Sequence, residues 1–262
     1  MIDDEKKKCI FHDYREDVFN SRNKRGRLRK NYWDEFEFAK SKWFEETNYL
    51  KRTLIFALTH SCCDVEYISS VKDTYSSYCS DYLSNYPRAD IMNGWWFCFK
   101  TIYSRKKTVT RKSFLEEYRF DCKKGYQKTL DDIDEITGFI AHQKEYKTLC
   151  SFLAIAYSAG NMTPSLHNPP EQLGAWEYKV NKYTQNDNDL KKIKQKLLFM
   201  DYDSDPVYDK NDLSGYMESR IEKILKRSYR IAMKAYTGNI AHELYTELRS
   251  NLDEYLQNLE DS

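Results

Sequence analysis

The scarcity of helix-breaking residues is the feature that most constrains the fold. The 262 residues include 5 prolines and 8 glycines, and only Pro87 precedes residue 164. Proline removes a backbone donor and clashes with the preceding turn, so long stretches without it favour long helices. The sequence therefore predicts a mainly α fold, a single compact multi-helix domain over 1–262 with a minor β-hairpin and a soft boundary near residue 160.

Apolar periodicity places the helices of the first half. Apolar and aromatic side chains recur every three or four positions over 64–86, which indicates one helical face. The segment 93–104 (NGWWFCFKTIYS) is nearly all apolar and is expected in the core, followed by a short strand at 108–110. One or two helices are predicted over 130–158, where 150–157 (CSFLAIAY) is apolar on every side and should be central.

Four acidic residues open the last of these predicted segments, and helical patterns continue in the second half. Asp131, Asp132, Asp134 and Glu135 are expected near a helix N-terminus, where the dipole favours negative charge. Further helices are predicted over 171–185, 189–200 and 217–236. Over 240–259, leucines at four-residue steps predict a last helix. Its apolar stripe is interpreted as core packing or, alternatively, as a face that binds a protein partner.

Composition sets limits on location and partners. With 42 basic and 41 acidic residues the net charge is +1, so a nucleic-acid surface must be a local patch. No apolar run is long enough to span a bilayer, and the first residues, MIDDEKKKCIF, lack the apolar core of a signal peptide. We expect no membrane partner and a cytoplasmic location. The 7 cysteines contain no CxxC pair, which argues against a structural zinc site and for reduced, buried thiols.

One stretch, 22–30 (RNKRGRLRK), is densely basic. Clustered cations bind phosphates by releasing counterions, and the aromatic Tyr32 and Trp33 that follow are suited to stacking on bases. The sequence predicts a nucleic-acid contact here; a solvated loop balanced by nearby acids is the alternative. The candidate binding residues are Arg22, Lys24, Arg25, Arg27, Arg29 and Lys30.

An acidic turn, 201–212 (DYDSDPVYDKND), has the ligand spacing of an EF-hand loop, with carboxylates at positions one, three, five, nine and twelve. Pro206 stands where that loop needs a glycine, and position twelve is Asp212 in place of glutamate. A looser divalent-ion site is one interpretation, and a polar turn in which Asp209 or Asp212 caps the next helix is the other. The candidate metal ligands are Asp201, Asp203 and Asp205.

The loop 157–176 (YSAGNMTPSLHNPPEQLGAW) interrupts the helical pattern with stiff and polar residues. Gly160 permits a turn directly after a buried helix, and three prolines stiffen the path. A loop anchored in this way is able to hold Asn161, His167 and Asn168 in fixed positions. Reversal of the chain direction is an equally good explanation.

Several of these residues carry a family resemblance. The motif AGNMT, the later Asn168, Lys179 and the helix MESRIEKILKRSYRIA with Arg220 resemble the C-terminal HNH-type nuclease domain of modification-dependent restriction proteins of the GmrSD kind, over residues 157–235. The resemblance implies a metal-dependent nuclease with an upstream histidine that activates water. His142, in FIAHQKEYK, is the nearest upstream candidate for that general base, although the proline that follows the family's histidine is missing.

These observations lead to two functional hypotheses. The first is a nucleic-acid-acting protein, nuclease-like or toxin-like, in bacterial or phage conflict, with DNA or RNA as partner, a divalent metal ion as cofactor and His142, Asn161, His167 and Asn168 as catalytic residues. The second is a non-catalytic helical module that binds a protein. No Gly-rich phosphate loop, GxSxG or HExxH motif is present. Salt-sensitive nucleic-acid binding separates the two hypotheses.

Overall fold

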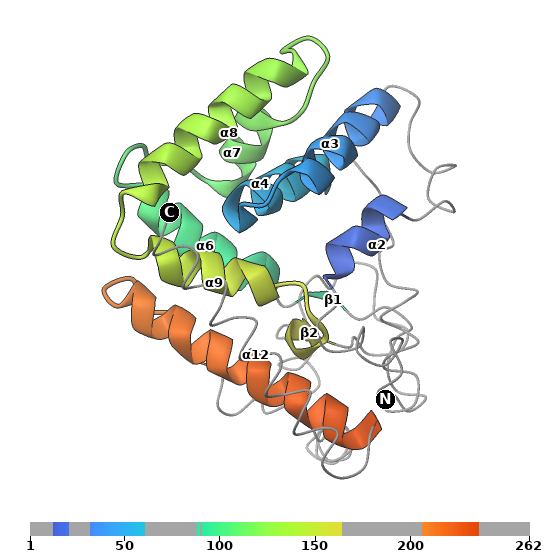
Figure 1. Cartoon of the computed structure of the whole chain (residues 1–262). Helices are drawn as coiled ribbons and strands as arrows, with labels where there is room; N and C mark the ends of the chain where they lie inside the picture. Colours follow the sequence, from blue (N-terminus) through green and yellow to red (C-terminus); the bar gives the residue numbers. More distant parts are fainter. Residues whose placement is uncertain (1–12, 21–31, 61–87, 90, 164–205, 236–262) are drawn as a thin grey trace, which may run out of the picture.

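The computed structural model describes residues 13–20, 32–60, 88–89, 91–163 and 206–235, and these form a mainly α structure, as predicted (Figure 1). The helices are α2 (Tyr14–Asn20), α3 (Trp33–Glu45), α4 (Tyr49–His60), α6 (Ile91–Tyr103), α7 (Arg111–Tyr118), α8 (Tyr126–Ala141), α9 (Tyr146–Ile155) and α12 (Leu213–Ala235), with the 3₁₀ turn η3 (Ala159–Asn161).

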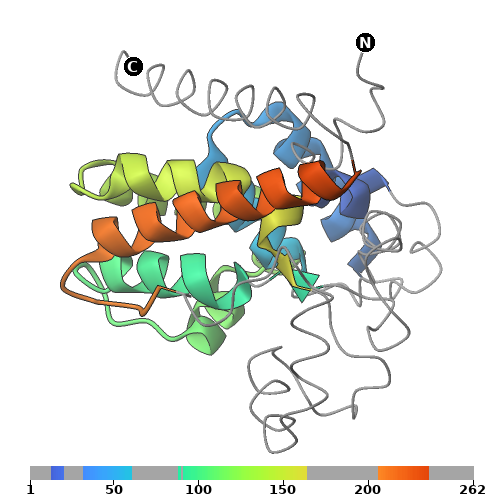
Figure 2. The same cartoon turned by 90° about the horizontal axis from the view of Figure 1, so that it is seen from below.

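Helix α9 lies at the centre of the described part. It contacts α4, α6 and α12, and α12 runs along its outer side (Figures 1 and 2). Leu149, Phe152 and Leu153 of α9 are completely buried. This burial confirms the prediction that 150–157 is central. The physical reason is that an element with apolar side chains on every side must be covered on every side.

The segment predicted to be core forms α6. Trp95, Cys98, Phe99 and Ile102 are buried there, and the aromatic rings of α6 pack against Phe114 of α7. Aromatic side chains at this density bury a large apolar area in a short helix, which ties α6 to its neighbours.

Local polar contacts fix where several helices begin. Thr110 and Ser113 form a capping box at the start of α7, since the Ser113 N–H donates to Thr110 Oγ1 at 3.1 Å and the Thr110 N–H to Ser113 Oγ at 2.9 Å. Asn48 caps α4 by accepting from the Leu50 N–H at 2.9 Å. Gly125 precedes α8 with φ 86°, a conformation that glycine adopts without strain.

Two sequence predictions differ from the structure in this region. Residues 108–110 form no strand, because Thr110 is the N-cap of α7. Helix α8 begins at Tyr126, so Asp131 and Asp132 lie one to two turns inside it and not at its positive end. Lysine side chains bind Asp132, as described below, and Asp131 Oδ1 accepts a hydrogen bond from Gln127 Nε2 at 3.0 Å.

In place of a hairpin, the described β structure is one short antiparallel pair. Strand β1 (Arg88–Ala89) pairs with β2 (Met162–Thr163), with Arg88 opposite Thr163 and Ala89 opposite Met162. The two strands are far apart in the sequence, so this pair fixes the chain just after η3 to a distant segment.

Helix α2 is attached to the core through a completely buried arginine. The Arg15 guanidinium binds the Asp13 carboxylate, donates to Thr53 Oγ1 at 2.6 Å and to the Leu153 carbonyl at 3.0 Å, and lies over the Tyr157 ring. Burial opposes its charge, but the Asp13 carboxylate outweighs that effect and raises the pKa of Arg15. A buried charge is tolerated only with such partners.

Several predicted features lie outside the described residues: the helices over 64–86, 171–185, 189–200 and 240–259, the basic stretch 22–30, and His167, Asn168, Lys179, Asp201, Asp203 and Asp205. Among the helices that the structure describes, none has the length and apolarity that crossing a bilayer requires.

Candidate functional site

The turn that follows α9 holds Asn161 in the interior. Its side chain is 0 % exposed, and Asn161 Nδ2 donates to the Ala156 carbonyl at 2.9 Å. This bond satisfies one of the carbonyls that the end of α9 leaves without a helical partner. Asn161 thus closes the C-terminal end of the central helix.

The second polar atom of Asn161 contacts α12. Arg220 Nη2 donates to Asn161 Oδ1 at 3.3 Å, although the two residues are 59 positions apart. Both residues belong to the set that resembles the nuclease family, and Arg220 is also buried. The amide therefore links α9 to α12 with both of its polar atoms engaged.

Gly160 allows this link to form. A Cβ atom at this position would lie 2.2 Å from Ser228 Oγ and 2.3 Å from the Ile224 carbonyl oxygen. The backbone of η3 therefore rests directly on α12, and no larger residue fits without displacing a helix backbone. The sequence predicted a turn at Gly160, and the structure adds the close approach as the reason for glycine.

Two buried thiols of the core are poor nucleophiles. Burial raises the pKa of Cys98 to about 12, although the nearby Arg220 charge acts in the opposite direction. Burial likewise raises the pKa of Cys150 to about 12. Both thiols stay protonated at neutral pH, whereas cysteine chemistry requires the thiolate. Cys122, in contrast, is exposed.

The structure does not bring His142 and Asn161 together. His142 is an exposed residue at the C-cap of α8, directly before the turn into α9, and Asn161 follows the other end of α9. The ten residues of α9 span about 15 Å at 1.5 Å per residue. A water held by His142 would be too far from Asn161 for the two to share one reacting atom.

The described part of the acidic turn makes local contacts. Asp212 caps α12, with the Gly215 N–H donating to Asp212 Oδ1 at 2.9 Å, as one of the two interpretations predicted. Asp209 Oδ1 accepts from the Asn211 N–H at 2.8 Å. Within the described ranges, no three His, Cys, Asp or Glu side chains are grouped so that they could hold a metal ion.

A basic segment that the sequence analysis missed, residues 105–128, lies over the α6–α7 loop, α7 and the start of α8. It has nine cations against three carboxylates, an excess of six in a protein whose net charge is +1. A charge count in a sliding window would have found it. The cations are Arg105, Lys106, Lys107, Arg111, Lys112, Arg119, Lys123, Lys124 and Lys128.

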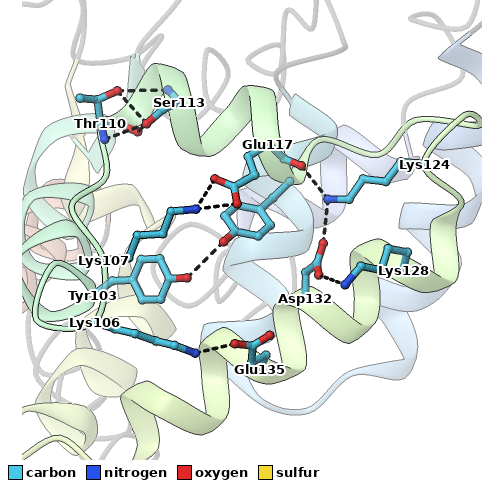
Figure 3. Close-up of polar contacts among 11 residues, drawn as sticks. Tyr103, Lys106, Lys107, Thr110, Ser113, Glu117, Lys124, Lys128, Asp132 and Glu135 are labelled. Atoms are coloured by element: carbon cyan, nitrogen blue, oxygen red, sulfur yellow. Dashed lines mark hydrogen bonds and ion pairs between the residues drawn. The ribbon is translucent and has the colours of Figure 1, made fainter.

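Lysines and carboxylates alternate across this surface (Figure 3). Lys107 Nζ lies 2.7 Å from Glu117 Oε1, and Lys124 Nζ donates to the Glu117 carbonyl at 2.6 Å. Asp132 then joins Lys124 at 2.8 Å and Lys128 at 2.5 Å. Burial acts to raise the pKa of Asp132, but hydrogen bonds from the two lysines outweigh it and lower the pKa.

Two further ion pairs attach the α6–α7 loop to α8 and α9. Lys106 Nζ lies 2.5 Å from Glu135 Oε1 on an exposed surface. Arg105 binds the buried Glu145 carboxylate with two bonds of 2.7 and 2.8 Å. The hydrogen bonds from the Arg105 guanidinium lower the pKa of Glu145 more than burial raises it.

The basic segment contacts the start of α3 through Arg119. The Arg119 guanidinium lies 4.5 Å from the centre of the Tyr32 ring, and Phe38 of α3 packs against Phe120 and Tyr126. The basic stretch 22–30 ends two residues before Tyr32 in the chain. The contact therefore places Tyr32, the residue before α3, beside one cation of the segment 105–128.

Comparison with known proteins gives no match. No protein-family model fits the chain, no curated protein is significantly similar to it, and no solved structure is significantly similar in fold.

Proposed function

We propose that this protein binds and acts on nucleic acid, as a nuclease-like or toxin-like component of bacterial or phage conflict. The contact of Arg119 with Tyr32 carries the binding part, because Tyr32 contacts a cation of 105–128 and comes two positions after the basic stretch 22–30 in the sequence. A protein with net charge +1 needs local groups of cations such as these in order to hold a polyanion.

The cleavage part rests on the resemblance of residues 157–235 to the HNH-type nuclease domain. In this function Asn161 and Arg220 hold α9 and α12 together, because both are buried and bound to each other. His142, His167 and Asn168 stay the predicted catalytic residues. A divalent metal ion is the cofactor that such cleavage requires.

Binding and cleavage are tested on labelled DNA and RNA between about 50 and 200 mM salt, with Mg²⁺ or Mn²⁺. We expect the wild type to bind with a steep salt dependence. Charge reversal of Arg25, Arg27 and Arg29 to Glu should remove three phosphate contacts and lower the slope of log affinity against log salt by about 2.7 on duplex DNA.

A control with the same change in charge carries Lys144, Lys210 and Lys226 changed to Glu, three exposed lysines outside the segments 22–30 and 105–128. If this control is as stable as the wild type, we expect it to bind nucleic acid with the affinity of the wild type. His142→Ala should abolish cleavage and leave binding unchanged if His142 is the general base. A wild-type protein that neither binds nor cleaves at low salt would contradict the proposed function.

A protein-interaction module is the second candidate, and an exposed aromatic group favours it. Phe97 of α6 is 42 % exposed and Val207 is 88 % exposed. The centres of the Phe97 and Tyr208 rings are 5.5 Å apart, and Val207 is the residue before Tyr208 in the chain. Phe97 and Val207 therefore lie near each other, just before the start of α12. A partner captured by the wild type and lost in Phe97→Ser, with no nucleic-acid binding in either, would support this candidate.

A further inference from the structure

We propose that the basic segment 105–128 is a second phosphate-backbone contact, which binds nucleic acid by exchanging its exposed carboxylate partners for phosphates. This role rests on the nucleic-acid binding proposed above and extends it to residues outside the stretch 22–30. It assigns the contact to four side chains of the α6–α7 loop, α7 and the α7–α8 connection. They are Lys107, Arg111, Lys112 and Lys123.

The distribution of charge is the first reason. The segment's excess of six positive charges means that the remainder of the chain is net negative by five, since the total is +1. Folding uses only part of this excess, since three carboxylates outside the segment, Asp132, Glu135 and Glu145, pair with its cations. The like charges that remain on this surface repel one another. A polyanion that lies across this surface would be attracted locally, although the whole molecule is nearly neutral.

The second reason is that the ion pairs divide into two kinds. Glu145 and Asp132 are largely buried and hold Arg105, Lys124 and Lys128 in place. Because breaking a buried pair leaves an uncompensated charge, these three cations have a structural role. Arg105 fixes the α6–α7 loop to the start of α9, and Lys124 fixes the α7–α8 connection to α8, while Lys128 binds Asp132 within α8.

Apart from the half-buried Arg119, the remaining cations are exposed. Lys107 and Glu117 have side chains that are 50 % and 44 % exposed, and Lys112, 85 % exposed, lies 3.8 Å from Glu116. Exposed pairs of this kind contribute little to stability and are screened by salt. A phosphate can therefore replace the carboxylate at small cost, and Lys107 needs no rearrangement of the backbone to bind it.

The chemistry of this surface favours nucleic acid over a membrane. A helix that binds a lipid surface presents apolar side chains beside its cations. On α7, Phe114 is completely buried and Tyr118 is 8 % exposed, so its large rings point into the core. The exposed residues of α7 are all polar or charged, which suits a phosphate backbone.

The test neutralises three exposed lysines with little risk to the fold. In the variant, Lys107, Lys112 and Lys123 are changed to Gln; the control has Lys144, Lys210 and Lys226 changed to Gln. We expect the slope of log affinity against log salt to fall by about 2.7 on duplex DNA, or about 2.1 on single strands, in the variant and not in the control. Equal thermal unfolding of the two proteins confirms that both are folded.

Three results would overturn the inference. If the wild type binds and only the Arg25, Arg27 and Arg29 variant loses affinity, the proposed function stands and the second contact does not exist. If the wild type binds no nucleic acid, both fail. If the glutamine variant of 105–128 keeps its nucleic-acid affinity but loses binding to vesicles that contain phosphatidylserine, the surface contacts lipid instead.

Discussion

Removal of the Asn161 amide tests whether this residue supports the fold or takes part in chemistry. Asn161→Ala removes the hydrogen bond to the Ala156 carbonyl and the bond from Arg220 Nη2. A neutral amide bond contributes about 1 kcal/mol and a bond to a charged group about 1.5–3 kcal/mol. Because the Arg220 bond is long at 3.3 Å, the lower end applies, and the expected loss is about 2–3 kcal/mol.

The loss is measured by urea unfolding followed by circular dichroism. A double-mutant cycle of Asn161→Ala with Arg220→Met separates the contact from other effects, and we expect a coupling of about 1 kcal/mol. The folded Asn161→Ala protein should keep its nucleic-acid affinity. Stability within about 0.5 kcal/mol of the wild type, together with abolished cleavage, would refute the structural role and make Asn161 catalytic.

Two further predictions concern the same scaffold. Gly160→Ala should lower the free energy of unfolding by about 1–3 kcal/mol. The added change Ser228→Ala should not restore it in urea titrations, because the Ile224 carbonyl still obstructs the new methyl group; full rescue would contradict the packing. Since the pKa of Glu145 is lowered in the folded state, its contribution to stability is present above about pH 4.5 and is lost as the pH falls further. The thermal midpoint should therefore fall less steeply with acid in Glu145→Gln than in the wild type, and parallel curves would show that the pair with Arg105 contributes nothing.

The helical fold was predictable because its signals are local. Scarce prolines and glycines and the apolar run 150–157 depend on neighbouring residues alone, and α9 is central as expected. The position of Asp131 and Asp132 was predicted wrongly because α8 begins at Tyr126, and the charges that stabilise Asp132 come from lysine side chains and not from the helix terminus. Lys124, which precedes α8 in the chain, binds Asp132. The sequence patterns typical of helix ends do not predict a pair between these two positions.

The candidate site was less predictable because its contacts join distant segments. The sequence marked Asn161 as polar and well anchored, but its burial depends on α12, whose Arg220 follows 59 residues later. The basic segment 105–128 was not predicted because acidic residues elsewhere in the chain bring the net charge to +1. Several of these acidic residues form ion pairs with the segment (Figure 3).

The most direct test of the account is the salt dependence of nucleic-acid binding by the wild-type protein and its two cation variants. We predict a steep loss of affinity with salt for the wild type. The slope should fall by about 2.7 on duplex DNA in the variant with Arg25, Arg27 and Arg29 reversed, and by a similar amount when Lys107, Lys112 and Lys123 are neutralised. Wild-type affinity that is absent at low salt, or that does not change with salt, would contradict the central claim.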